Sequence, residues 1–412
     1  MNQTGQPDLT AILPVGRWWI LLGLWLLYAS FGLIVVSISP LVAPIEASLN
    51  MSHAAMGSVM GAWQLVYIFS AIPCGVLLDR LGGRKALLIG AGLIAVSAAG
   101  RAFAVDYWSF LLAVMLFGLG GPIISSGAPK VVAQLFEGSQ RGLAMGIYMT
   151  GPAAGGVVCL TMTHSVLLPW LNNDWRMVMS LWAIVAVCAG VLWWLICWRA
   201  GLPDEAELTQ TKPQTQIMAE LIHQPAVRVL LLMSVGVFLY NHGLNNWLPE
   251  LLQTHGMSAA EAGFWAALPT VVGILGSLII PRLATGERRF RILLALCGVA
   301  VLATVLLQFQ SQQSLALGLI LQGIARSSMM TVLVLTLVEL PGIGERRAGV
   351  ASGMFFSAAE VGGVLGPLGL GIVYDVTGGF STSLTALSCV AVLLMIGTAY
   401  LSRLAGPSRT SA

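Results

Sequence analysis

The sequence predicts an all-α integral membrane protein with twelve transmembrane helices in two six-helix bundles. Three observations lead to this prediction: the composition, the length of the apolar runs and a repeat between the two halves of the chain. Of the 412 residues, 57% are hydrophobic and 9% are charged, with a mean hydropathy of +0.86. Soluble domains of ordinary size cannot bury so much apolar surface. The lipid bilayer is therefore an expected partner of the chain.

About twelve apolar runs are long enough to cross a bilayer, which takes about 20 residues per helix. The N-terminal segment before the first run has no basic stretch and no cleavage signature, so we expect that run to remain in the mature protein. The predicted spans are 18–41, 55–78, 86–104, 108–134, 142–165, 176–198, 228–252, 260–281, 291–309, 313–339, 348–372 and 380–402.

Basic residues fall on every second connection between these spans. Clustered Lys and Arg mark the cytoplasmic side of a membrane protein, and the alternation would fail if one span had been missed. We therefore expect both termini to be cytoplasmic and the protein to lie in a cell membrane, as in the bacterial inner membrane. The basic connections contain Arg17, 79–85, Arg141, 199–228, 282–291, Arg346 with Arg347, and Arg403 with Arg409.

The halves repeat one another around one long polar stretch. We expect an N-terminal bundle at 1–199, a cytoplasmic linker at 200–225 and a C-terminal bundle at 226–412. Residues 51–57 match 257–263, and residues 146–156 match 353–363. Each copy of the first pair has a serine, Ser52 or Ser258, at the N-cap position, and Ser258 with Glu261 has the spacing of a capping box. Small residues at the glycine-rich positions predict close helix packing.

The connection at 75–85, GVLLDRLGGRK, is the most specific motif. It has the pattern G-x3-D-R-x-G-x-R-K that the major facilitator superfamily carries between helices 2 and 3, and the chain resembles that family over essentially its full length. The resemblance implies two bundles that rock about a midplane site, with a cytoplasmic gate at this loop. It also implies that the aspartate packs near helix 11 and holds the outward-open state. The matching residues are Gly75, Asp79, Arg80, Gly82, Arg84 and Lys85.

Other segments refine the resemblance. Residues 286–289 form a degenerate second copy of the loop, and 151–156 is similar to the antiporter signature of drug exporters. The chain also resembles the cyanate-permease-like branch at 37–41, Arg101, 129–130 and 247–249, which implies uptake of a small anion or polar solute. The family's helix 4 often has an arginine where this chain has Val114, so a charge relay through that arginine is absent.

Arg326 is the best candidate for substrate binding. It lies near the middle of its predicted span, where an arginine is disfavoured by roughly 2.5 to 3.5 kcal/mol on insertion scales. The resemblance places its helix at the central cavity. The alternative is that Arg326 forms a structural ion pair with Glu360, which lies at a similar depth on the next span. Glu360 is also the candidate for proton coupling.

Helix 7 carries a polar cluster of five residues, Tyr240, Asn241, His242, Asn245 and Asn246. Such side chains must face protein or water, because lipid cannot satisfy them. We favour a cavity lining in which Asn241, His242 and Asn245 contact the substrate; the alternative is that they satisfy a broken helix. His242 could carry protons, but we expect a hydrogen-bonding role.

Tyr28 and Lys130 belong to the same hypothesis, whereas Arg101 has a different expected role. Tyr28 occupies a matching place in helix 1 and is a candidate for substrate contact. Lys130 in helix 4 either contacts the substrate or extends its ammonium group to the cytoplasmic interface. Arg101 is expected at the opposite interface for the same reason.

The sequence therefore predicts a secondary transporter for a small organic or inorganic anion, or a small polar solute, with a proton symporter as the coupled form of this hypothesis. No Walker A motif or catalytic motif is present, so we expect neither an enzyme nor ATP hydrolysis, and no cofactor, metal site or nucleic-acid partner. The six cysteines have no ligand spacing. We expect a monomer. The alternatives are a proton-coupled exporter of drugs or metabolites and, less favoured for want of an output domain, a membrane sensor.

Overall fold

The computed structural model describes residues 14–200, 214–284, 286, 288–340 and 343–405, and these residues contain helices and no strand. The chain divides into two compact units. The first consists of Met1–Asn50 and Ala62–Thr209, and the second of Met51–Gly61 and Gln210–Ala412. The all-α prediction is confirmed.

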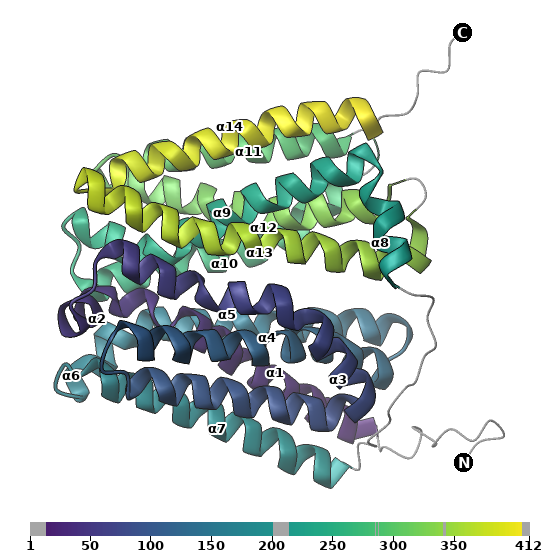
Figure 1. Ribbon diagram of the computed structural model, residues 1–412, viewed down its shortest axis with the longest axis horizontal. Helices are drawn as coiled ribbons and strands as arrows, with labels where there is room; N and C mark the ends of the chain where they lie inside the picture. Colours follow the sequence, from purple (N-terminus) through teal and green to yellow (C-terminus); the bar gives the residue numbers. More distant parts are fainter. Residues whose placement is uncertain (1–13, 201–213, 285, 287, 341–342, 406–412) are drawn as a thin grey trace. The chain divides into compact units, whose positions relative to one another are not determined.

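The first unit is a bundle of long helices that lie alongside one another (Figure 1). A 3-10 turn at Ser39–Leu41 and the short helices α2 and α6 connect them, and a π-helical turn at Thr163–Leu167 extends the end of α5. The helices are α1 (Pro14–Val36), α2 (Val42–Leu49), α3 (His53–Ala102), α4 (Tyr107–Leu135), α5 (Gly138–Met162), α6 (Leu168–Trp170) and α7 (Trp175–Ala200).

Helix α1 is shorter than predicted, because it ends at Val36 and not near residue 41. Pro40 lies four residues further on. Proline has no backbone N–H, and it disfavours helical conformation in the residue before it. The chain therefore leaves the α-helix and makes the 3-10 turn at Ser39–Leu41.

The second unit contains the first residues of α3, up to Gly61, and then the helices from α8 onward. Helix α8 is a short helix inside the expected linker, where the sequence predicted none. It packs on α13 and α9 (Figure 1). Linker residues 201–213 lie outside the described residues, as does Glu287 of the degenerate motif. The helices are α8 (Gln214–Ile222), α9 (Pro225–Thr254), α10 (Ala259–Leu283), α11 (Arg288–Leu306), α12 (Gln312–Val338), α13 (Gly344–Thr377) and α14 (Phe380–Ala405).

Helix α3 contains two of the predicted spans. It has 50 residues, and its backbone is non-helical at Gly82, where φ is 74° and ψ is 164°. At 1.5 Å per residue its chain would be about 75 Å long, more than twice the roughly 30 Å hydrocarbon core of a bilayer. The chain must therefore cross once on each side of Gly82. Within the described residues eleven helices are long and apolar enough to span a membrane, and the division of α3 makes twelve crossings.

Two glycines show that the halves repeat in three dimensions as well as in sequence. A methyl group on Gly155 of α5 would overlap the carbonyl oxygen of Ala29 on α1, and one on Gly362 of α13 would overlap that of Val235 on α9. These glycines occupy the same place in the matching segments 146–156 and 353–363. The predicted close packing through small residues is confirmed at both places.

The predicted helix caps are also present. Ser258 Oγ accepts a hydrogen bond from the Glu261 amide at 3.3 Å, and the Glu261 carboxylate accepts one from the Ser258 amide at 2.9 Å. In the other copy, Ser52 Oγ accepts a hydrogen bond from the Ala55 amide at 3.2 Å. Each cap satisfies an amide that the first helical turn leaves without a partner.

We predict that Gly82→Ala destabilises the protein, because a side chain is strained at this positive φ by about 1–3 kcal/mol. The matched control is Gly75→Ala seven residues earlier, where a Cβ would meet nothing within 4 Å and alanine is the better helix former by about 1 kcal/mol. The apparent Tm in detergent should fall for the first variant and stay level or rise for the second. Equal Tm values for the two variants would contradict the assignment of the turn to Gly82.

Candidate functional site

The second unit contains a hydrogen-bonded cluster of polar side chains from α9 and α12, which we call the α9–α12 polar cluster. It consists of Asn241, Asn245, Gln322 and Arg326. Arg326 Nη1 donates to Asn245 Oδ1 at 2.8 Å, and Gln322 Nε2 donates to the same oxygen at 3.0 Å. Because Gln322 and Arg326 are four residues apart on α12, they project from one face of that helix. Asn245 thus receives two donors from one neighbouring helix.

The position of Arg326 in α12 makes it a deeply placed cation. It has 14 residues before it and 12 after it in Gln312–Val338, or about 20 Å to either end at 1.5 Å per residue. Its side chain is partly exposed, and its hydrogen bond to Asn245 is the one that its guanidinium donates among the described residues. A guanidinium has five N–H donors. Several of them are therefore available to a ligand.

Two carbonyl oxygens of the cluster are buried and unsatisfied. Asn241, one turn before Asn245, donates through Nδ2 to the backbone oxygen of Arg326 at 3.4 Å. Its own Oδ1, like Oε1 of the fully buried Gln322, has no hydrogen-bond partner among the described residues. Unsatisfied buried polar atoms are uncommon and costly. Each of these two oxygens is able to accept a hydrogen bond.

Glu360 of α13 is buried away from Arg326. Its side chain is 6% exposed, and Oε2 has no hydrogen-bond partner within the described part of the chain. The structure shows neither a hydrogen bond nor an ion pair between Glu360 and Arg326 among those residues. The two side chains therefore do not form a structural ion pair in this conformation.

The remaining polar residues of α9 point to different partners. His242 lies within electrostatic range of Arg326, its ring packs 5.3 Å from the Phe238 ring, and its carbonyl accepts a hydrogen bond from Asn246 Nδ2 at 2.8 Å. Tyr240 instead is fully buried and donates to the Ala300 carbonyl of α11 at 3.1 Å. A cavity-lining role for Tyr240 is wrong, because its hydroxyl fastens α9 to α11. Gln322 was missed, although its place one turn before Arg326 could have indicated it.

Tyr28 and Lys130 lie in the first unit. The Tyr28 ring of α1 stacks on the Tyr148 ring of α5 at 5.7 Å. Lys130 Nζ forms an ion pair with Asp79 Oδ1 at 2.8 Å. Neither interpretation of Lys130 anticipated this pair, which joins α4 to the 75–85 motif within α3.

The other residues of that loop have the following surroundings. Gly75 and Arg80 lie before the turn at Gly82, and Arg80 is exposed. The Arg84 carbonyl accepts a hydrogen bond from Trp193 Nε1 of α7 at 3.2 Å, and Lys85 is exposed. The loop is therefore joined to the first unit through α4 and α7.

Arg101 is buried, not interfacial as predicted. Only 1% of it is exposed, and Nη1 donates to the Ile34 carbonyl at 2.8 Å and to Ser37 Oγ at 3.1 Å. These acceptors lie where α1 ends. The last carbonyls of a helix lack partners within it, and a cation there also interacts well with the helix dipole. Arg101 is thus the C-terminal cap of α1, and the early end of α1 before Pro40 is the signal that could have indicated it.

Asp375, near the end of α13, caps the beginning of α3. Its two carboxylate oxygens accept hydrogen bonds from the amides of His53 and Ala54 at 3.1 and 2.8 Å. The His53 ring stacks on Tyr374 at 3.9 Å and on Trp247 at 5.1 Å, each at an interplanar angle of 6°. All these residues belong to the second unit. No local pattern in the sequence indicates that residues 322 positions apart make this cap.

Comparison with known proteins gives a consistent result. The family model described as Major Facilitator Superfamily matches residues 21–367. A quinolone resistance transporter of Acinetobacter baumannii is 28% identical and covers 85% of this chain and 86% of its own. A probable galactarate/D-glucarate transporter of Bacillus subtilis is 24% identical over 95% of both chains. The cyanate transport protein of Escherichia coli is 26% identical over 63% of this chain and 65% of its own.

The fold is similar to that of solved transporters. The crystal structure of a nucleoside transporter matches with a TM-score of 0.78 and 12% identity, covering 94% of this chain and 99% of the other. The likeness in structure extends over both units, and the family model covers far more than half of the sequence. The chain therefore belongs to the Major Facilitator Superfamily, a family of membrane transporters.

Proposed function

We propose that the protein is a secondary transporter of a small organic or inorganic anion, with the α9–α12 polar cluster as its anion site. The observation that supports this proposal is Arg326: a cation near the middle of a spanning helix, hydrogen-bonded to an amide and to no carboxylate within the described residues. Placing a charge there costs free energy. A bound anion would offset that cost and would accept the remaining guanidinium hydrogen bonds.

The neighbouring side chains suit a ligand that combines negative charge with hydrogen-bond donors. The side-chain oxygens of Asn241 and Gln322 have no hydrogen-bond partner among the described residues. Because they can only accept hydrogen bonds, they would favour hydroxyl or amide groups on the same ligand. An acidic sugar has both kinds of group. Cyanate has only the charge. Relatives named for galactarate or D-glucarate and for cyanate agree with an anionic substrate of one of these two kinds.

Proton coupling through Glu360 is the second part of the proposal. Burying an ionised carboxylate without a cation costs several kcal/mol, whereas a neutral carboxyl group costs less. A carboxyl group that holds a proton while buried and releases it when water reaches it would carry one proton per cycle. We propose that such a cycle drives transport by rocker-switch alternating access about a midplane site, in a monomer whose two termini are cytoplasmic.

An exporter of drugs or metabolites is the alternative. The similarity of 151–156 to the antiporter signature and the relative named for quinolone resistance favour it. The two candidates predict different ligands. A ligand that binds only the folded protein raises its thermal stability, so the purified protein can be screened with sodium cyanate, D-glucarate and norfloxacin. Stabilisation by norfloxacin and by neither anion would reject the anion site in favour of export.

We predict that Arg326→Lys weakens binding of the stabilising anion by about tenfold or more, which corresponds to about 1.4 kcal/mol. The ammonium keeps the charge but lacks the planar fork that binds an anion through two hydrogen bonds. The measurement is a titration by thermal shift or calorimetry. Arg291→Lys, an exposed arginine at the start of α11, is the matched control and should bind like the wild type. An unchanged affinity in Arg326→Lys would show that the arginine is structural.

We predict that Glu360→Gln strongly reduces proton-driven uptake but leaves the exchange of substrate across the membrane intact. In reconstituted vesicles, uptake driven by a proton gradient should fall by about tenfold or more, because an amide cannot carry the proton. Counterflow of labelled substrate without a gradient should continue. Glu250→Gln on α9, a partly buried glutamate, is the matched control. Gradient-driven uptake at the wild-type rate in Glu360→Gln would exclude this residue as the coupling site.

A further inference from the structure

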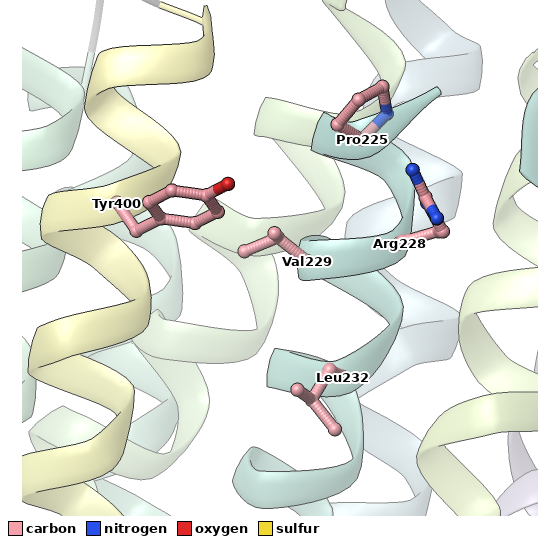
Figure 2. Close-up of a pocket in the computed structure, with 5 residues that line it drawn as sticks. All are labelled: Pro225, Arg228, Val229, Leu232 and Tyr400. Atoms are coloured by element: carbon pink, nitrogen blue, oxygen red, sulfur yellow. The ribbon is translucent and has the colours of Figure 1, made fainter. Parts of the chain in front are cut away.

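A groove in the second unit lies where α9 begins and α14 ends. Its cavity has a volume of about 340 Å³. Figure 2 shows Tyr400 of α14 on one side, with its hydroxyl directed toward α9, and Arg228 on the other. The five residues that line it are Pro225, Arg228, Val229, Leu232 and Tyr400.

The groove combines an apolar floor with a cation at one end. Leu232 is 73% exposed and Tyr400 is 52% exposed, although both belong to membrane-spanning helices. Arg228, in the first turn of α9, is exposed, and its guanidinium makes no hydrogen bond or ion pair with other described residues. Arg403 follows Tyr400 by three residues on α14 and is exposed too, so the two lie on adjacent positions of one helix face. Positive charge therefore gathers at the end of the groove that is nearest the helix termini.

We propose that this groove binds a phospholipid with an anionic headgroup. The phosphate would accept hydrogen bonds from the Arg228 guanidinium, whose planar fork suits phosphate oxygens. One acyl chain would lie along Val229 and Leu232. The proposal concerns a surface separate from the α9–α12 polar cluster and goes beyond the transport function.

The geometry favours a lipid over a soluble anion. A soluble anion would gain the contact with Arg228 but would leave the apolar floor exposed. An amphiphile covers both parts, and burying apolar surface against an acyl chain fills space that the two helices leave open. Basic pockets between transmembrane helices on the cytoplasmic side bind anionic lipid headgroups in this manner. Tyrosine, like Tyr400 of this groove, is enriched where the hydrocarbon of the bilayer meets the headgroups.

The orientation proposed from the charge pattern agrees with this choice of ligand. The start of α9 follows the linker at 200–225 and the end of α14 precedes the C-terminus, and both segments are expected on the cytoplasmic side. Anionic lipids give that leaflet its negative surface potential. The groove and the proposed ligand would therefore meet in the same leaflet.

The test is native mass spectrometry of the full-length protein in detergent with dioleoyl phosphatidylglycerol or dioleoyl phosphatidylcholine, which share their acyl chains. We expect the wild type to bind the phosphatidylglycerol about fivefold more tightly or better. Arg228→Gln should reduce this preference to about one, since it removes the charge and keeps a polar, though shorter, side chain. Arg291→Gln, an exposed arginine that does not line the groove, should leave the preference unchanged.

Two results would overturn the proposal. One is an equal phosphatidylglycerol preference in Arg228→Gln and Arg291→Gln, which would show that the preference arises from overall charge and not from this groove. The other is competition by inorganic phosphate at the concentration that saturates the lipid, which would show an anion site that needs no acyl chain. Leu232→Gln tests the floor independently of the charge. It should weaken binding of both lipids together, and an unchanged affinity for both would reject the acyl-chain contact.

Discussion

The constraint on which this structure depends is that hydrocarbon cannot satisfy a polar group. Each polar side chain in a spanning helix must find its partner inside the protein. Tyr240 donates to a carbonyl of α11, and Arg101 donates to the Ile34 carbonyl near the end of α1. Both side chains are fully buried, and both join two helices. Most of the polar residues in the spans are thus part of the packing, so polarity within a span does not by itself identify a functional site.

The residues of the α9–α12 polar cluster and Glu360 differ from Tyr240 in their contacts. Asn241, Gln322 and Glu360 each have a buried oxygen without a hydrogen-bond partner among the described residues, and Arg101 has such a nitrogen, Nε. What sets Asn241 and Gln322 apart is that they share hydrogen-bond partners with the deeply placed Arg326 or contact its backbone. A fold selected for stability alone would have replaced such groups with apolar residues of similar volume, which is often neutral or stabilising. The proposed anion and the proposed proton would each supply a hydrogen-bonding partner to these groups.

The sequence was sufficient to predict the features that depend on local pattern or on composition. The apolar runs predicted the spans, the glycine-rich segment that contains Gly362 predicted close packing, and Ser258 with Glu261 predicted a cap. The site was predicted only in part. Arg326 and Asn245 could be chosen because a polar residue deep in an apolar run is visible in the sequence. That Asn245 joins Arg326 to Gln322 depends on how α9 and α12 rotate about their axes, which the sequence does not state.

The errors have the same origin. Arg101 was expected at the interface because an arginine near the end of a span can extend toward water. That reasoning considers one helix at a time, whereas the acceptor that buries Arg101 belongs to another helix, whose end is set by Pro40. Lys130 with Asp79 is a second case: each residue was assigned a role alone, and the structure pairs them at 2.8 Å. A charged residue in a membrane protein therefore has to be interpreted together with the neighbouring helices.

Arg326 and Glu360 are two charged residues on consecutive helices that do not form a pair. If the two neutralised each other, both could be retained only to satisfy one another, and neither would need a substrate or a proton. In the structure they do not meet, so each one separately adds to the free energy of the folded protein. Two independent costs of this kind in one bundle require two independent compensations. An anion at the guanidinium and a proton at the carboxylate are the simplest pair, and their binding and release in the same cycle would couple one flux to the other.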